Sequence, residues 1–221
     1  MKRVLLSLVI FTMIAGSLFA LPADKPESDP ISDDLMALQT ANMLARYGYR
    51  VQSASALIGA AEILARIRVQ PMGVQPERTQ QVTTADTPEF TVTNLLADAR
   101  RLAGRNRQLT SWANDVERAY NTVTRGPVGG PRFSNGIIGG LDSHTYHIQL
   151  RGGARSDVTL VGNGVSDLDL FLFDGAGRLV IASQGWDDVE SVWVVPARTE
   201  VFTIVVRNFG RNNNRYQLFV D

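Results

Sequence analysis

The chain has two regions in which apolar residues recur with different periods. Between residues 32 and 124 they recur every three to four positions, the spacing of one face of an α-helix. From residue 140 onward they alternate with polar residues, the spacing of a β-strand that buries one face. The change of period predicts an α + β multidomain protein, in which a helical domain of four helices precedes an antiparallel β-sandwich of about seven strands.

The pattern of the helical region predicts two helical hairpins. Ser32 can cap the first helix, and Gly48 suits the left-handed position at which a helix stops. A second helix is predicted over 53–68, and Thr93 is predicted to cap the third. Such helices must bury their apolar faces, which favours a four-helix bundle or two stacked hairpins. The polar stretch 70–88 between the hairpins is expected to be a long loop.

A Gly/Pro-rich linker at 125–139 separates the helical domain, 32–124, from the β-sandwich domain, 140–221. Short alternating segments bounded by turn residues predict the strands of that sandwich. They lie at 145–150, 157–161, 167–173, 178–182, 191–195, 201–207 and 216–220.

The first 20 residues are typical of a signal peptide. Lys2 and Arg3 precede an apolar run, and small residues up to Ala20 predict cleavage near that residue. The alternative is an uncleaved membrane anchor. A Pro/Asp/Ser-rich leader at 21–31 is expected to be flexible. We therefore expect a mature chain outside the cytoplasm, in the periplasm or secreted, without a membrane span. The chain has no cysteine and a net charge of zero, which leaves no thiolate metal site and disfavours nucleic acid as a partner.

One strand carries a candidate metal site. In the segment 167–174 the leucines share one face, while Asp167 and Asp169 share the other, where like charges require a cation or hydrogen-bond donors between them. Together with Asp174 and Asn163 they form a candidate calcium site, because calcium prefers carboxylate and carbonyl oxygens. The alternative is that these carboxylates accept hydrogen bonds from turn amides and fix the loops.

Residues 140–221 resemble the bacterial pre-peptidase C-terminal domain. The resemblance is carried by Tyr146 with Ile148 and Leu150, by the acid–leucine strand and by a closing tyrosine strand, at 146–150, 157–160, 167–174, 202–206 and 216–220. The resemblance implies a β-sandwich appended to secreted proteins, often peptidases, that serves in substrate binding, secretion or stabilisation. Some relatives bind calcium or collagen. In this chain a helical domain, and no peptidase, precedes the sandwich.

The sequence contains no recognisable catalytic motif. His144 and His147 are an odd number of positions apart, so on a strand they face opposite sides and do not form a paired metal site. Trp186 and Asp187 lie in a turn, where an exposed aromatic ring beside polar groups can contact sugars or peptides. The alternative is that Trp186 packs over the end of the sandwich.

We therefore expect an exported, non-catalytic binding or scaffold protein whose β-sandwich contacts protein or glycan. One alternative is an accessory protein, such as an inhibitor, chaperone or secretion helper, of a separate secreted peptidase. Another is an envelope structural protein whose helical hairpins mediate self-association.

Overall fold

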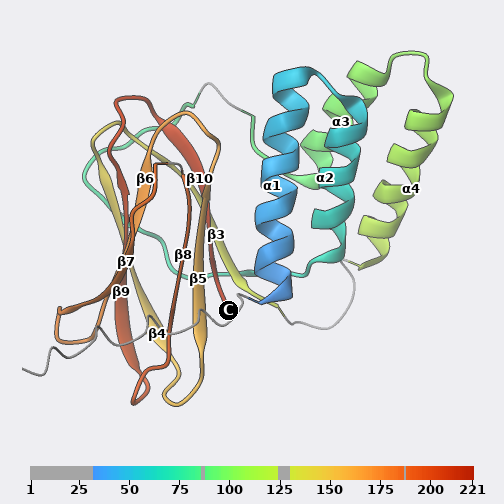
Figure 1. The fold of residues 1–221 in the computed structure, drawn as a ribbon. Coiled ribbons are helices and arrows are strands. Elements are labelled where there is room, and N and C mark those ends of the chain that lie inside the picture. The colour runs from blue at the N-terminus through green and yellow to red at the C-terminus, as the bar shows by residue number, and fades with distance from the viewer. Residues whose placement is uncertain (1–31, 86–87, 124–129, 187) are drawn as a thin grey trace, which may run out of the picture. The chain divides into compact units, whose positions relative to one another are not determined.

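The described part of the chain forms four helices and a sandwich of two five-stranded sheets, most of whose strands follow the helices (Figure 1). The structure is a computed structural model, and it describes residues 32–85, 88–123, 130–186 and 188–221. The predicted signal peptide, the leader and the first part of the predicted linker lie outside these residues. The α + β class predicted from the sequence is confirmed.

The helices are α1 (Asp33–Val51), α2 (Ala54–Arg66), α3 (Val92–Ala103) and α4 (Arg107–Val123). The strands are β1 (Gln70–Pro71), β2 (Glu77–Arg78), β3 (Arg132–Ile138), β4 (Ser143–Leu150), β5 (Ser156–Gly162), β6 (Leu168–Phe173), β7 (Leu179–Ser183), β8 (Val189–Val194), β9 (Glu200–Asn208) and β10 (Asn214–Val220). None of the described helices is long and apolar enough to cross a membrane.

Side-chain caps start the first three helices. The Ser32 hydroxyl accepts a hydrogen bond from the Leu35 amide, and Ser53 caps α2 in the same way. The cap of α3 is Thr91, two residues before the predicted Thr93, because the Thr91 hydroxyl is the one that reaches a free amide, that of Asn94.

The predicted end of the first helix at Gly48 is wrong. Helix α1 continues to Val51, and Gln52 ends it in a left-handed conformation with φ of 53°. Gly48 instead provides a close approach between helices, since a Cβ atom there would lie 2.6 Å from the Leu57 side chain of α2. The glycine is required by packing rather than by a turn.

The two sheets have the strand orders β1-β3-β10-β5-β8 and β2-β4-β9-β6-β7. All seven predicted strands are present within one or two residues of their expected ends. Apart from the parallel pair β1–β3, neighbouring strands run antiparallel. Leu168, Leu170 and Leu172 of β6 are buried in the core between the sheets, as their alternation predicts.

Three further strands lie where the sequence indicated loops. β3 falls within the predicted linker 125–139, and Phe133 pairs with Phe219 of β10, their ring centroids 5.2 Å apart. β1 and β2 fall within the polar stretch 70–88, and Met72 beside β1 is buried in the sandwich core. These three strands are fixed by pairing with distant segments, which local composition does not report.

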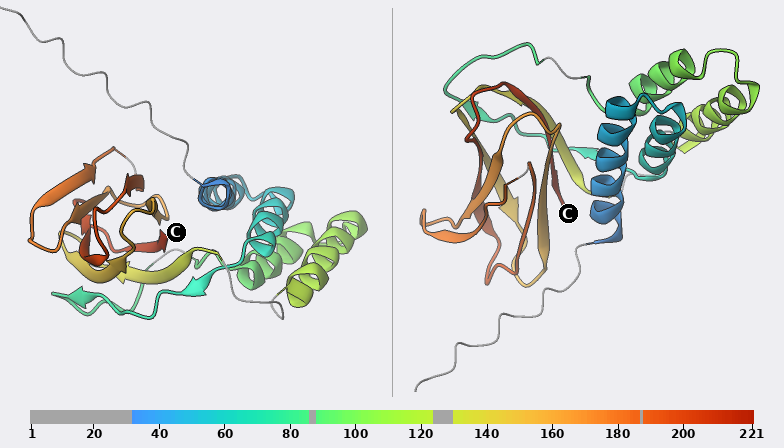
Figure 2. Two further views of the ribbon diagram at one scale, coloured as in Figure 1. Left: turned by 90° about the horizontal axis from the view of Figure 1, so that it is seen from below. Right: turned by 45° about the horizontal axis from the view of Figure 1, so that its top comes forward.

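Helix α1 joins the helical region to the sandwich. Leu35 and Leu38 form a buried cluster with Val161 of β5 and Phe219 of β10. Figure 2 shows α1 beside the sheet that contains these strands, with the other three helices on its far side. The opposite side of α1 packs on α2 through Ala45 and its neighbours.

Candidate functional site

Four loops meet at one end of the sandwich, and we call this region the loop end. It comprises residues 139–142, 163–167, 184–188 and 209–213, of which 187 is outside the described residues. Backbone hydrogen bonds of 2.9 Å tie Leu141 to Gly210 and Phe209 to Asp167, so three of the loops are directly connected.

Large apolar side chains protrude from three of these loops. Trp186 is completely exposed, while Leu141 and Phe209 are 67% and 41% exposed. The Arg207 guanidinium lies 4.6 Å from the centre of the Phe209 ring, in cation–π contact. Exposed aromatic and aliphatic groups gathered in one region are typical of binding surfaces rather than of ordinary solvent-facing loops.

Leu141 adopts a backbone conformation that is unusual for its type. Its φ angle is +62°, in the left-handed region that a bulky residue avoids at a cost of about 1–2 kcal/mol. The hydrogen bond from its amide to Gly210 and the close approach of Gly140 to the Arg211 backbone hold it there. The loop therefore keeps an exposed leucine where glycine would be less strained.

Two buried asparagines hold the loops in place through side-chain hydrogen bonds. The Asn208 side-chain amide donates to the carbonyls of Gly139 and Asn212 at 3.0 and 2.8 Å, and its oxygen accepts from the Gly210 amide. Asn214 likewise contacts Ser166 through its amide nitrogen. Both residues are fully buried, and each side-chain amide that finds its partners there holds loop backbone in place.

The loop that carries Trp186 is held on both sides. The Gln184 amide nitrogen donates to Asp169 at 3.0 Å, and the Gly185 amide donates to Glu190 at 2.7 Å. After Trp186 the chain returns to Asp188, which is buried. The exposed ring therefore stands on a loop whose base is fixed, which lowers the entropy lost when a ligand contacts it.

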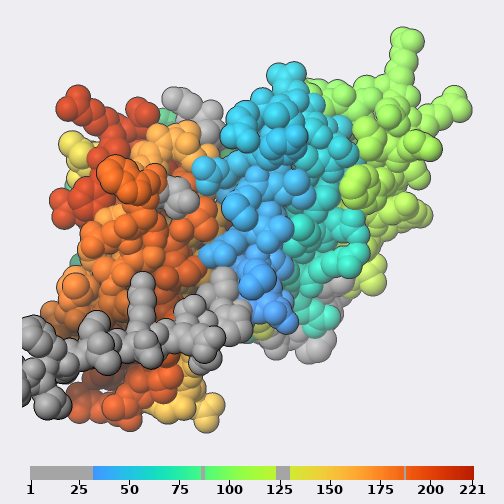
Figure 3. All heavy atoms as spheres, in the orientation of Figure 1, coloured from blue at the N-terminus to red at the C-terminus, as the bar shows by residue number. Residues whose placement is uncertain are grey.

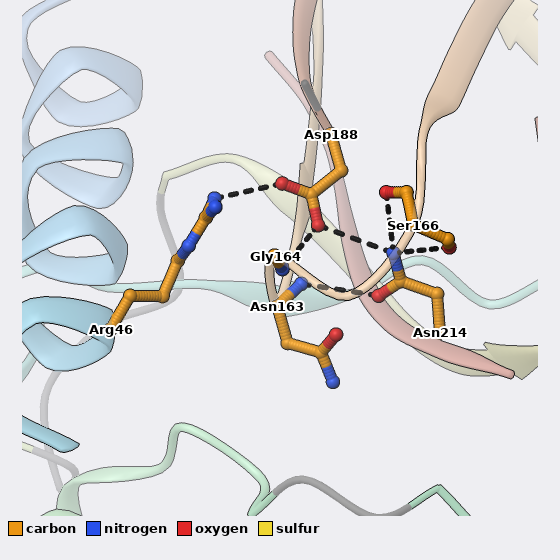
Figure 4. A network of polar contacts seen from close by, with 6 residues as sticks. All are labelled: Arg46, Asn163, Gly164, Ser166, Asp188 and Asn214. Atoms are coloured by element: carbon orange, nitrogen blue, oxygen red, sulfur yellow. Dashed lines mark hydrogen bonds and ion pairs between the residues drawn. The ribbon is translucent and has the colours of Figure 1, made fainter. Parts of the chain in front are cut away.

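Asp188 connects this loop to the helical region. Its Oδ1 atom accepts from Arg46 of α1 at 2.7 Å, and its Oδ2 atom accepts from the Gly164 amide and from Asn214 (Figure 4). The side chain is only 1% exposed, so a charge-assisted partner is needed to offset its desolvation. The contact fixes α1 against the loop end.

A buried polar cluster lies inside the sandwich. His144 Nδ1 is 2.8 Å from the Tyr216 hydroxyl, which is 2.6 Å from the Tyr146 hydroxyl. Burial lowers the pKa of His144 to about 4 and raises the pKa of Tyr216 well above its ordinary value. His144 is fully buried and His147 exposed, which confirms that the two histidines face opposite sides. The cluster has no access to a substrate and stabilises the core.

The structure separates the predicted calcium ligands. Asn163 and Asp167 lie in the loop end, and Asp169 is buried on β6 beside Gln184. Asp174 lies at the other end of β6, where its carboxylate accepts from the amides of Ala176 and Arg178 and pairs with the Arg178 guanidinium at 2.7 Å. The Arg178 amide and guanidinium lower the pKa of Asp174.

These contacts support the interpretation of Asp174 as a turn-fixing residue. Among the residues that the structure describes, no group of three or more histidine, aspartate or glutamate side chains could hold a metal ion. The calcium site stays a prediction from the sequence.

Of the predicted binding residues, Trp186 is placed on the surface and Asp187 lies outside the described residues. Leu141 and Phe209 were not predicted as binding residues. The sequence held two signals for them: Leu141 directly follows Gly139-Gly140, and Phe209 directly precedes Gly210. Neither residue continues the alternation of a strand.

The fold and the site together define a β-sandwich with a presented loop surface and a helical region fixed to it. No family model matches the chain, and no curated protein matches it. Solved structures similar to it include the pre-peptidase C-terminal domain of collagenase from Bacillus anthracis, at 14% identity and a TM-score of 0.35. That match covers 42% of this chain and 91% of the collagenase domain. The solved structures thus include a member of the class that the sequence resembles.

Two further similar structures are binding proteins by their descriptions. One is PliG of Aeromonas hydrophila, a periplasmic inhibitor of g-type lysozyme, at 14% identity and a TM-score of 0.33, covering 41% of this chain and 84% of that one. The other is a carbohydrate-binding module of Cellvibrio mixtus lichenase 5A in complex with cellotriose, at 9% identity and a TM-score of 0.28. It covers 42% of this chain and 87% of the module. These similarities concern the fold.

Proposed function

We propose that this chain is an exported, non-catalytic binding protein whose loop end contacts a protein or glycan ligand. The observation that carries the proposal is the complete exposure of Trp186 on a loop that is hydrogen-bonded through Gln184 and Gly185 before the ring and through Asp188 after it. A tryptophan ring exposed to water lacks the stabilisation that burial of its apolar surface would give. A ligand that covers the ring supplies this stabilisation, which favours binding.

The other exposed side chains of the loop end support the same function. Leu141 and Phe209 add apolar area, and Arg207 beside Phe209 offers a planar cation that can pair with carboxylates or stack on rings. The export part of the proposal rests on the basic and apolar pattern of residues 1–20.

Binding to a defined panel tests the proposal. The panel contains soluble polysaccharides, peptidoglycan fragments and secreted proteins, including g-type lysozyme and cellotriose, and affinities are measured by calorimetry for the wild type and for Trp186→Ala. A ligand of the loop end should lose at least about thirtyfold in affinity, since truncating a central aromatic residue costs about 2 kcal/mol or more.

The matched control is Val195→Ala, which shortens an exposed apolar side chain at the opposite end of the sandwich. It should leave the affinity unchanged. Equal affinity of Trp186→Ala and wild type for every ligand found would place the binding surface elsewhere. Turnover of a bound ligand, abolished by changing one polar residue, would overturn the non-catalytic assignment.

A further inference from the structure

Helix α1 exposes a line of apolar residues on the side that neither the sandwich nor α2 covers. Met36, Met43, Tyr47 and Val51 are each 46–55% exposed, although the helix is otherwise packed on both neighbours. Figure 3 shows α1 uncovered along its length on the face of the molecule turned toward the viewer. Unpaired apolar side chains in a row on one helix indicate a surface that is covered in an assembly.

Three residues of this line, Met36, Met43 and Tyr47, have the spacing of a coiled-coil seam, whereas Val51 lies one position beyond it. Positions 33, 36, 40, 43, 47 and 50 follow one another at intervals of three and four residues in strict alternation, as a and d positions of a heptad do. All six residues at these positions are exposed. We call them the α1 seam. Such a seam fits a second helix, because knobs at this spacing fill the holes of a helical partner.

The two ends of the seam carry opposite charges. Asp33 stands at its N-terminal end and Arg50 at its C-terminal end, where the Arg50 guanidinium lies 5.8 Å from the centre of the Tyr47 ring. Each charge also suits the local end of the helix dipole. A helical partner of complementary charge must therefore present a cation to the first end and an anion to the second.

We propose that the occupant of the α1 seam is α1 of a second copy of this chain, running antiparallel about a two-fold axis. In the register that opposes Thr40 to Met43 of the partner copy, Met36 opposes Tyr47 and Asp33 opposes Arg50, and symmetry repeats every pair. In this one register all six seam positions face a seam position of the partner copy, and each acidic end faces a basic end. A parallel pair would instead place Asp33 beside Asp33 and Arg50 beside Arg50.

This interface is formed by α1 and not by the loops. The dimer proposal is therefore independent of the proposed binding function. The seam is short, and the dimer is expected to be in rapid, concentration-dependent exchange with the monomer. Each charged pair occurs twice in a two-fold dimer, so one substitution perturbs two contacts.

Cysteine cross-linking tests the register directly, because the natural chain contains no cysteine. A mixture of Met36→Cys and Tyr47→Cys protein should form an intermolecular disulfide under mild oxidation, since these positions oppose one another. Met36→Cys alone should not, because antiparallel pairing separates the two copies of position 36 by 11 residues, about 16 Å along the helix. Cross-linking of Met36→Cys alone would show a parallel pair and overturn the proposal.

Charge reversal provides the second measurement, with sedimentation equilibrium of the purified protein as the readout. Asp33→Arg and Arg50→Asp should each weaken dimerisation about tenfold, and the double variant should recover most of the loss. The matched control is Arg118→Asp on the exposed side of α4, which should have no effect. A protein that stays monomeric at several hundred micromolar, or a dimer indifferent to both reversals, would refute the antiparallel seam.

Discussion

Removing the carboxylate of Asp188 is expected to destabilise the protein strongly. In Asp188→Ala, Arg46 loses its ion-pair partner, and the Gly164 amide and the Asn214 side chain lose an acceptor. Breaking a fully buried pair costs about 3–5 kcal/mol. Arg46 keeps 29% of its side chain in contact with water, which lowers that part of the cost. The unpaired donors add about 1 kcal/mol each, so we expect a loss of about 3 kcal/mol.

The assay is urea unfolding at pH 7, followed by circular dichroism and supported by calorimetry. For a chain of this length a loss of about 3 kcal/mol lowers the midpoint of thermal unfolding by about 6–12 °C. Asp174→Ala is the matched control, because it removes a carboxylate that also pairs with an arginine, but on an exposed turn. Its effect on the free energy of unfolding should be smaller than that of Asp188→Ala, because the Arg178 partner is 81% exposed and solvent screens the pair.

A double-mutant cycle with Arg46→Met isolates the contact between helix and loop end. Because the two side chains touch, the cycle should give a coupling of about 1–2 kcal/mol. A loss below 1 kcal/mol for Asp188→Ala, or additive effects in the cycle, would refute the role of Asp188 as the residue that fixes α1 to the sandwich.

Three further predictions concern pH, backbone strain and metal. Because burial lowers the pKa of His144 from 6.5 to about 4, only the unfolded chain gains a proton between these values. The free energy of unfolding should fall by up to about 3 kcal/mol from pH 6.5 to 4. His144→Gln should remove most of this slope, and His147→Gln should keep it. Leu141→Gly should raise the free energy of unfolding by about 0.5–1 kcal/mol by relieving the positive φ, and a loss on urea unfolding would contradict this strain. Calcium in place of a chelator should leave the thermal midpoint unchanged, since Asp174 is already held by Arg178; a rise of several degrees, lost in Asp169→Asn, would restore the calcium site.

Most of the fold could be predicted because it is encoded in local periodicity. The alternation of Leu168, Leu170 and Leu172 identified a central strand, and Ser32 before α1 identified its cap. Strand β3 could not be predicted in the same way, since a glycine interrupts it and its partner, β10, lies some 80 residues further along the chain. Gly48 misled the prediction because the sequence does not distinguish a glycine needed for a turn from one needed for close helix packing.

The binding surface could be predicted only in part. A lone tryptophan in a polar turn pointed to Trp186, but the loops that bring Leu141 and Phe209 to the same end come from distant segments of the chain. The contact made by Asp188 could not be predicted from its neighbours in the sequence. Its role depends on Arg46, which lies 142 positions earlier, and only the tertiary fold brings the two together.

The most direct test of the binding function uses Trp186 as its own reporter. The chain contains three tryptophans, and changing Trp112 and Trp193 to phenylalanine leaves Trp186 alone to fluoresce. In the free protein its emission should be that of a ring in water, and acrylamide should quench it freely. We predict that the tightest ligand of the panel shifts this emission to shorter wavelength and protects it from acrylamide. Saturating binding, confirmed by calorimetry, with emission and quenching unchanged would contradict the assignment of the loop end as the binding surface.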